Sequence, residues 1–349
     1  MMKPRLRQVA EQAGVSLTTA SMALSGKGHI SHAVRLRVVD TAQRIGYARK
    51  APKETAPSTI TILLPVDDKW AHVFYLIRPI IVEIERTLIT AGYYPAILPT
   101  FYESNVENTI AKILANEAKA VFSIHYGNAA LFSQLEGMGI PVVVIMNSNY
   151  QDTFYSVCVD DFQGAYEGTL HLIKLGHKAI GYVDFPRPDL PASVVDRYIG
   201  FKKALDEYGF PFDSSWRLTV PQDDRAALGE GLRALFSSKD RPTALFVHDD
   251  HFAARVMSEL AVQGLTVPED VSLIAPGDVL NYSDPFVPQI TTMRINTVLM
   301  GQISAELILN RMRRKPDDDI HVLKIKQQLV DRGSCRRIGE RPAALAAES

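Results

Sequence analysis

The sequence has 349 residues, of which 46% are hydrophobic and 22% are charged. A chain of this length and composition is expected to form two or three compact globular units, which excludes a disordered or fibrous protein. No apolar run approaches the ~20 residues of a membrane span, and the first residues contain no apolar signal core, so we expect a cytoplasmic protein with no membrane partner.

The net charge of −1 is unevenly distributed along the chain. Residues 1–50 contain nine Lys and Arg against two Asp and Glu, a charge of +7, which leaves −8 for the remaining residues. A basic head on an acidic body favours a polyanion as the partner of the head; the alternative is a solvated basic helix face. Cys158 and Cys335 lie far apart and outside any CxxC or Cys/His cluster, which predicts free thiols and no zinc site.

The head begins with two short helices separated by a tight turn. Residues 6–13 have an amphipathic pattern, and Gly14 can adopt the positive φ that ends a helix. Ser16 is a suitable N-cap for a second helix over 17–24. Two short helices joined by a Gly-containing turn form a helix-turn-helix, whose second helix enters the DNA major groove.

A third helix is expected to complete the head. Ser31 is its predicted N-cap, an apolar stripe follows, and Gly46 ends it. Small residues should allow the helix axes to approach closely: Ala10, Ala13, Ala20 and Ala23. Larger apolar residues should form the core: Val9, Val15, Leu24, Val38 and Ile45.

From residue 58 onward, short apolar strands alternate with helices. The predicted strands are 60–64, 94–98, 120–124, 141–145, 155–159, 179–183, 243–247 and 271–275. The helices expected between them include 76–91, 108–115, 164–175 and 197–208. This alternation is typical of parallel sheets with helices on both faces, and the length favours two α/β lobes.

The head resembles the lactose-repressor/galactose-repressor family of bacterial transcription factors. The resemblance rests on the run 6–16, on 19–25, and on His29-Ile-Ser, Arg35 and Gly46-Tyr47 at fixed spacing. It implies base contacts from the second helix, with hydroxyls and cations near phosphates. The candidate DNA-binding residues are Arg7, Ser16, Leu17, Thr18, Thr19, Ser21, Met22, Ser25, His29, Ser31 and Arg35.

Two departures from the family pattern affect DNA recognition. Met22 stands where many members have a basic or polar residue, and Ser25 stands where Asn is usual. Leu17 and Met22 would favour apolar contact with thymine methyls over a bidentate hydrogen bond to a base. The linker 49–58 lacks the leucine that the family inserts into the minor groove, and Pro52 and Pro57 each oppose a helix by roughly 3 kcal/mol. We therefore expect weaker minor-groove wedging than is usual for the family.

The resemblance continues through six further segments up to about residue 338 and implies a periplasmic-binding-protein-like core. The expected domains are a helix-turn-helix head over 1–48, the linker, a core over 59–338 and a tail over 339–349. The first lobe would comprise about 59–158 and 292–320, and the second about 159–290 and 321–338. The tail has no heptad pattern, so no tetramerising coiled coil is predicted.

A ligand is expected beyond the carboxyl ends of the strands, between the lobes. The candidate ligand-binding residues are Asp67, Ser123, Tyr126, Asn147, Ser193, Arg197, Asp249, Asp250 and Asp278. Arg197 and Asp250 also match positions that contact ligand in the family, whereas any single carboxylate could instead be a solvated loop residue or a helix cap. Gly277 stands where sugar-binding members have Asp, and Pro191 stands where a purine-binding relative would need a cation. A pentose or hexose is compatible with this pattern, and a purine is not supported.

Enzymatic chemistry is not predicted. The sequence contains no GxGxxG at the first strand–helix turn, no phosphate-binding GxxxxGK[ST] and no GxSxG. His248 and His251 flank two aspartates, but contiguous residues at a strand end point in alternating directions, so a shared metal is not expected. No cofactor is predicted.

The leading hypothesis is a cytoplasmic homodimeric transcriptional regulator, associated with the nucleoid through its DNA, whose affinity for a pseudo-palindromic operator responds to a small polar effector, such as a sugar. Repression is the family's usual outcome, and activation is the open alternative. The rival hypothesis is a solute-binding protein with no DNA role. The basic head and the lack of a signal core argue against it.

Overall fold

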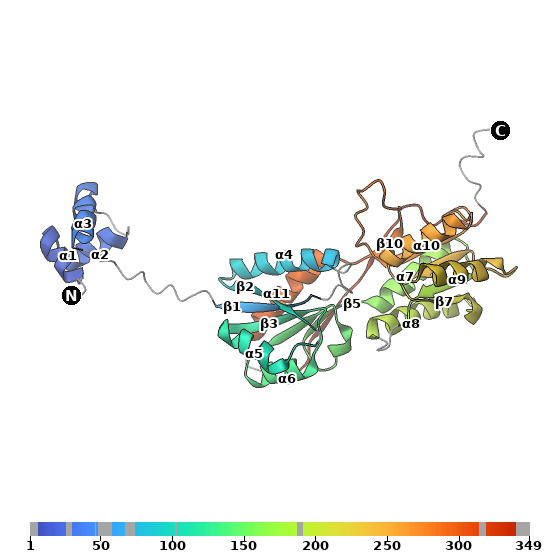
Figure 1. The fold of residues 1–349 in the computed structure, drawn as a ribbon, viewed down its shortest axis with the longest axis horizontal. Helices are drawn as coiled ribbons and strands as arrows, with labels where there is room; N and C mark the ends of the chain where they lie inside the picture. The colour runs from blue at the N-terminus through green and yellow to red at the C-terminus, as the bar shows by residue number, and fades with distance from the viewer. Residues whose placement is uncertain are drawn as a thin grey trace. The chain divides into compact units, whose positions relative to one another are not determined.

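The computed structural model describes residues 6–25, 30–45, 47, 58–66, 74–101, 103–186, 191–313 and 319–339. The chain divides into two compact units, Met1–Pro57 and Ser58–Ser349. Figure 1 shows a helical first unit and two sheet-containing lobes in the second unit. The predicted fold class, a helical head followed by two α/β lobes with parallel sheets, is confirmed.

The head contains α1 (Leu6–Ala13), α2 (Leu17–Ser25) and α3 (His32–Arg44). Gly14 has φ 62°, as the tight turn requires. The Ser16 hydroxyl accepts a hydrogen bond from the Thr19 N–H at 3.0 Å and so caps α2. Ser31 occupies the N-cap position of α3, but its side chain makes no capping hydrogen bond.

The core of the head is built from small residues. Val9, Val38 and four alanines are buried, with Val15, Leu24 and Ile45 packed against them as predicted; the alanines are Ala10, Ala13, Ala20 and Ala23. Because these side chains are short, the three helices can pack closely around one small cluster. Gly46, the linker 49–57 and the tail from 340 onward lie outside the described residues.

The first lobe of the second unit is a six-stranded parallel sheet. Its strands are β1 (Thr59–Pro65), β2 (Tyr94–Thr100), β3 (Ala118–Ile124), β4 (Val142–Ile145), β5 (Ser156–Val159) and β11 (Val322–Ile325). They follow the order β11-β5-β4-β3-β1-β2. Its helices are α4 (Phe74–Thr90), α5 (Val106–Ala115), α6 (Ala129–Gly137) and α11 (Thr297–Arg313), with a 3₁₀ turn at Ser148–Tyr150.

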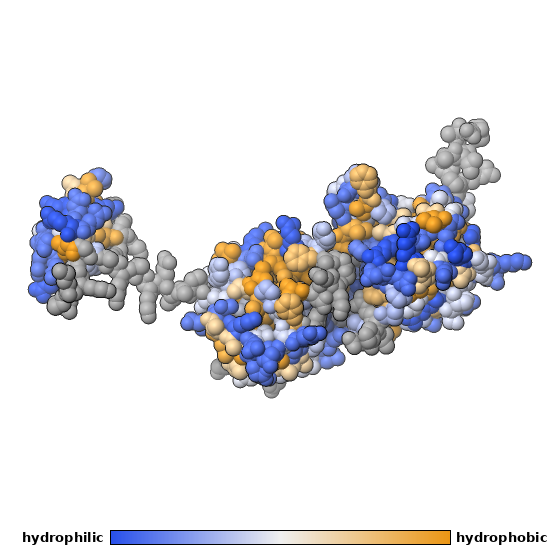
Figure 2. All heavy atoms as spheres, viewed as in Figure 1, coloured by the Kyte–Doolittle hydropathy of each residue, from blue (hydrophilic) through white to orange (hydrophobic). Residues whose placement is uncertain are grey.

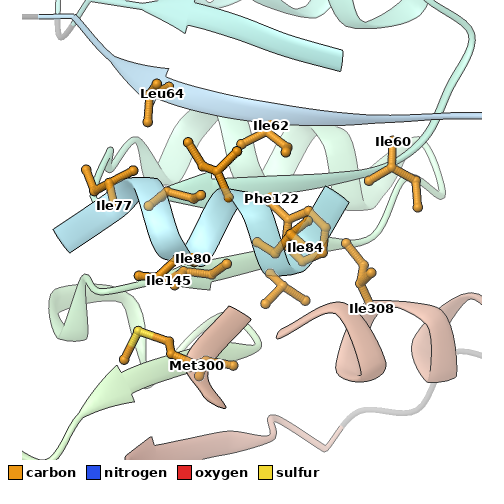
Figure 3. Close-up of a cluster of buried hydrophobic side chains, with 14 of the residues drawn as sticks. Ile60, Ile62, Leu64, Ile77, Ile80, Ile84, Phe122, Ile145, Met300 and Ile308 are labelled. Atoms are coloured by element: carbon orange, nitrogen blue, oxygen red, sulfur yellow. The ribbon is translucent and has the colours of Figure 1, made fainter. Parts of the chain in front are cut away.

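The two faces of this sheet bury separate apolar clusters. Ile80 of α4 and Met300 of α11 pack with Ile62 and Phe122 on one face, as Figure 3 shows. The other face buries α5 and α6. Strands buried on both faces are continuous apolar runs, which is why periodicity identified them as parallel strands.

The second lobe repeats the arrangement. Its strands are β6 (Ile180–Asp184), β7 (Arg217–Thr219), β8 (Ala244–Val247), β9 (Ser272–Gly277), β10 (Thr291–Arg294) and β12 (Gln328–Val330), in the order β12-β10-β9-β8-β6-β7. Only β12 is antiparallel to its neighbour. The helices are α7 (Asp161–Lys174), α8 (Ala192–Glu207), α9 (Arg225–Ser237) and α10 (Asp250–Val262), with a 3₁₀ turn at Ser214–Trp216.

The chain passes between the lobes three times. The first passage is at Asp160, between β5 and α7. The predicted boundaries at 290–292 and 320–321 are wrong by a few residues, because β10 pairs with β9 in the second lobe and β11 pairs with β5 in the first. The second and third passages are therefore 295–296 and 326–327. Within the described residues, no helix is both long and apolar enough to cross a membrane.

Candidate functional site

The outer face of α2 carries both apolar and hydroxyl side chains. Leu17 is 52% exposed and Met22 41% exposed, and Thr18 is exposed beside them. Ser21 is half-buried one turn after Leu17. The spacing 17, 18, 21, 22 puts these residues on one helical face, opposite the buried Ala20. Figure 2 shows apolar atoms at the surface of the head among strongly polar ones.

The remaining head candidates have more varied surroundings. Ser16 and Ser31 are exposed, and Arg35 is half-buried. The Thr19 hydroxyl lies 2.8 Å from that of Ser16 and so belongs to the helix cap. Arg7 pairs with Glu11 at 3.0 Å on the exposed side of α1. His29 and the side chain of Ser25 lie outside the described residues.

A cavity of about 130 Å³ lies between the two lobes of the core. It is lined by the ends of β5, β8 and β9, the start of α8, and residues of the first lobe. The described lining residues are Leu76, His125, Met146, Ser148, Cys158, Val159, Asp161, Ser193, Arg197, His248, Asp249, Asp250, His251, Pro276, Gly277, Val279 and Ile295. The position agrees with the rule that ligands bind beyond the carboxyl ends of parallel strands.

Arg197 and Asp161 form a buried ion pair in this cavity. Arg197 Nε lies 2.8 Å from Asp161 Oδ1, and the two side chains are 14% and 5% exposed. Arg197 Nη1 also donates to the His248 carbonyl oxygen at 2.9 Å. Burial opposes the charge of Arg197, but the Asp161 carboxylate outweighs it and raises the pKa of the guanidinium. The cavity therefore contains a fixed cation whose charge is already balanced.

Two adjacent aspartates begin α10 and have different roles. Asp249 Oδ1 accepts the Phe252 N–H at 2.7 Å and caps the helix. Asp250 is fully buried, and its Oδ2 accepts the Val279 N–H at 2.8 Å, the Leu280 N–H at 3.2 Å and the Tyr282 hydroxyl at 2.9 Å. Burial raises the pKa of Asp250 from 3.8 to about 6. Asp250 thus fixes the segment that follows β9.

The cavity brings together four of the nine predicted ligand residues: Ser193, Arg197, Asp249 and Asp250. Ser123 and Tyr126 are instead buried in the first lobe, where the Ser123 hydroxyl donates to the Tyr126 carbonyl oxygen at 2.9 Å. A residue at a strand end can equally point into the core of its lobe, and the strand pattern does not decide which.

Asn147 and Asp278 also do not line the cavity. Asn147 Nδ2 donates to the His125 carbonyl oxygen at 3.0 Å. Asp278 pairs with Arg294 and, at 2.5 Å, with Arg332. These partners hold the pKa of Asp278 below its usual value although burial acts in the opposite direction. Asp67 lies outside the described residues.

Sequence reasoning missed Asp161 and Cys158 as lining residues, whereas His125 was found at the end of its strand as expected. Asp161 follows β5, so the strand-end rule could have selected it. His248 and His251 were considered only as metal ligands. The described part of the chain contains no group of three or more His, Cys, Asp or Glu that could hold a metal ion.

Comparison with known proteins identifies both parts of the chain. Residues 5–50 match the family model of bacterial regulatory proteins of the lacI family, and residues 169–335 match the periplasmic binding protein-like domain. A curated relative, the HTH-type transcriptional repressor PurR of Mannheimia succiniciproducens, is 26% identical over 340 residues, which are 95% of this chain and 99% of the relative.

Solved structures show the same fold. The lac repressor dimer bound to operator and the anti-inducer ONPF has a TM-score of 0.68 at 20% identity, over 96% of this chain and 100% of that one. A LacI family regulator from Enterococcus faecium with bound ribose has a TM-score of 0.65 at 23% identity, over 80% of this chain and 100% of that one. The chain belongs to the lacI family of bacterial regulatory proteins, and is a non-enzymatic, DNA-binding transcriptional regulator with a periplasmic-binding-protein-like ligand-binding domain.

Proposed function

We propose that this regulator is a homodimeric repressor whose affinity for a pseudo-palindromic operator is controlled by a small polar effector of the sugar class. The effector binds in the cavity between the lobes. The observation that carries the proposal is this cavity at the ends of parallel strands, which contains the Arg197–Asp161 pair and Asp249. The ribose-bound relative supports a sugar as the effector.

The lining of the cavity suits such a molecule. Arg197 offers donors and Asp249 an acceptor, while Leu76 and Ile295 provide apolar contact. A small molecule with several hydroxyl groups on a carbon ring can accept from Arg197, donate to Asp249 and make the apolar contacts.

The exposed face of α2 supports operator recognition by the head. Leu17 and Met22 offer apolar contact to thymine methyls, and Thr18 offers a hydroxyl to a base edge. One such face can read only half of a site, so two copies related by a two-fold axis would read two half-sites roughly one helical turn or more apart. The operator-bound lac repressor dimer supports this assembly.

Selection of genomic DNA fragments by the full chain, at two salt concentrations, tests DNA recognition. We expect enrichment of fragments that share a pseudo-palindrome and that stay bound at the higher salt concentration, because non-specific binding weakens steeply with salt. Loss of Leu17 and Thr18 together (Leu17→Ala with Thr18→Ala) should weaken the selected site by at least about tenfold. Leu36→Ala is the matched control, because Leu36 is equally exposed, at 53%, but lies on α3. No enrichment, or equal losses in both variants, contradicts the proposal.

The effector role is tested on the selected fragment. A sugar that raises the thermal midpoint of the protein should also change operator affinity by about 5- to 150-fold, the usual range of allosteric coupling. Repression predicts that this change is accompanied by altered transcription of the adjacent gene in a reporter. A bound sugar that leaves operator affinity unchanged would refute effector control and leave DNA recognition intact.

A further inference from the structure

The charges that line the cavity do not balance. Among the described lining residues, Arg197 is the one cation, against the carboxylates of Asp161, Asp249 and Asp250. Asp161 already neutralises Arg197 at 2.8 Å, with both side chains largely withdrawn from water. Asp249 and Asp250 form no ion pair with a described residue, although the charge of Asp249 also acts on Arg197.

Asp249 has an oxygen available for a ligand. Its Oδ1 is occupied by the N–H of Phe252, whereas Oδ2 makes no hydrogen bond to any described residue. The side chain is half-buried and lines the cavity. A carboxylate oxygen only accepts hydrogen bonds, so the group that meets it must be a donor.

Asp250 provides a second, independent indication. Its Oδ2 has three donors, but its buried Oδ1 has no hydrogen-bond partner within the described chain. Oδ1 lies where Gly277 has no side chain: a Cβ on Gly277 would approach within 2.5 Å of it. Both residues line the cavity. A buried carboxylate oxygen without a donor favours a cation or a donor nearby.

His248 in the cavity wall does not supply the missing charge. His248 Nε2 lies 3.2 Å from Arg197 Nη1 and, facing that cation, acts as an acceptor. The ring is therefore neutral in this arrangement. An anionic ligand would therefore meet the carboxylates of Asp249 and Asp250, while Arg197 is already paired with Asp161.

We infer that the effector is a protonated primary amine carrying hydroxyl groups, of the size of an amino sugar, whose ammonium is accepted by Asp249 Oδ2. The inference rests on the proposed function and sharpens its ligand class. Hydroxyls of the ligand reach Arg197, and apolar ring carbons face Leu76 and Ile295. Acidic and phosphorylated sugars are excluded by repulsion from Asp249 and Asp250.

Matched ligands test this charge preference. The full chain is titrated calorimetrically at neutral pH with glucosamine, galactosamine and mannosamine, with each parent hexose, with each N-acetyl derivative, and with glucose 6-phosphate. We expect at least one hexosamine to bind at least about tenfold more tightly than both its parent and its N-acetyl form. Glucose 6-phosphate should not bind.

The substitution Asp249→Asn tests whether Asp249 causes the tighter binding of the hexosamine. Asn caps a helix about as well as Asp, so α10 should remain intact while the charge is lost. The advantage of the hexosamine over its parent should then disappear. Asp206→Asn, at an exposed position near the end of α8, removes the same charge elsewhere and should preserve the advantage. An unchanged melting temperature of both variants checks the fold.

The outcomes separate this inference from the proposed function. A neutral hexose that binds as tightly as its amine, an anion that binds, or a failure of every hexosamine to bind overturns the amine assignment. If a neutral sugar binds and changes operator affinity, the proposed function stands and only the amine assignment fails. If an amine binds through Asp249 but operator affinity does not change, the ligand class stands and effector control fails.

Discussion

The head and the cavity present their functional side chains in opposite ways. The head exposes Leu17 and Met22 to solvent, around a core of small residues. The cavity instead withdraws Arg197, Asp161 and Asp250 from water and satisfies them with one another and with backbone groups. A wide, regular partner such as a DNA groove can be met by a surface, whereas a small ligand needs groups fixed before it arrives. The head can therefore be altered with little effect on folding, and the cavity cannot.

The largest expected effect comes from breaking the buried ion pair. Asp161→Leu leaves the Arg197 guanidinium buried without its partner, which should lower the free energy of unfolding of the core by about 3–5 kcal/mol. Urea denaturation followed by circular dichroism measures it. The double variant Asp161→Leu with Arg197→Met should recover most of the loss, because no charge is then left unpaired. A single variant as stable as the parent would show that the pair is not buried in solution.

The pH dependence of stability tests the burial of Asp250. Its pKa rises from 3.8 to about 6 on folding, so the folded state holds the proton more tightly than the unfolded state. The resulting destabilisation is absent below about pH 3.8, grows as the pH rises and is complete above about pH 6, where it reaches roughly 3 kcal/mol. The stability of Asp250→Asn minus that of the natural chain should therefore increase over this window. A flat difference curve would contradict the burial.

Gly277 tests how closely the cavity wall is packed. It has φ 128°, and a Cβ there would lie 2.5 Å from Asp250 Oδ1. Gly277→Ala should thus cost about 1–3 kcal/mol of unfolding free energy. Gly137→Ala, within α6 and with no atom within 4 Å of an added Cβ, is the control and should be neutral or slightly stabilising. Equal effects at the two positions would argue against close packing at Gly277.

The smallest effect is expected on the exposed face of the head. Leu17→Ala should change the free energy of unfolding of the head by no more than about 0.5 kcal/mol, as is usual at exposed positions. Thermal denaturation checks this, alongside operator binding. A large loss of stability would mean that Leu17 supports the fold, and the head would then resemble the cavity in needing its functional side chains for stability.

The elements that could be predicted from the sequence are those with strong local signals. The turn at Gly14, the cap at Ser16 and the eight apolar strands were all found in place. The strands β7, β10, β11 and β12 were missed. β7, β11 and β12 are largely exposed and β10 is Thr-Thr-Met-Arg, so none has the buried apolar run that marks β4, which is equally short. Two of the missed strands, β10 and β11, explain the misplaced lobe boundaries.

The cavity was only partly predictable, because residue type and strand position do not fix side-chain direction. Ser123 follows the strand-end rule yet points into its lobe. Asp278 has the right chemistry yet is held by Arg332 and Arg294. Asp161 has both the right position and the right chemistry, but its pairing with Arg197 depends on the packing of α7 against α8.

The third passage between the lobes has a consequence for truncated forms of the protein. β11 is an edge strand of the first sheet and β12 is an edge strand of the second, although only two residues separate them. A stop codon or a proteolytic cut shortly before Val322 would uncover β5 and β10 together. Both strands are mostly buried, and each would have unpaired backbone groups along the newly exposed edge. A single truncation there would thus create two exposed sheet edges, and the product is expected to aggregate instead of persisting as a shorter regulator.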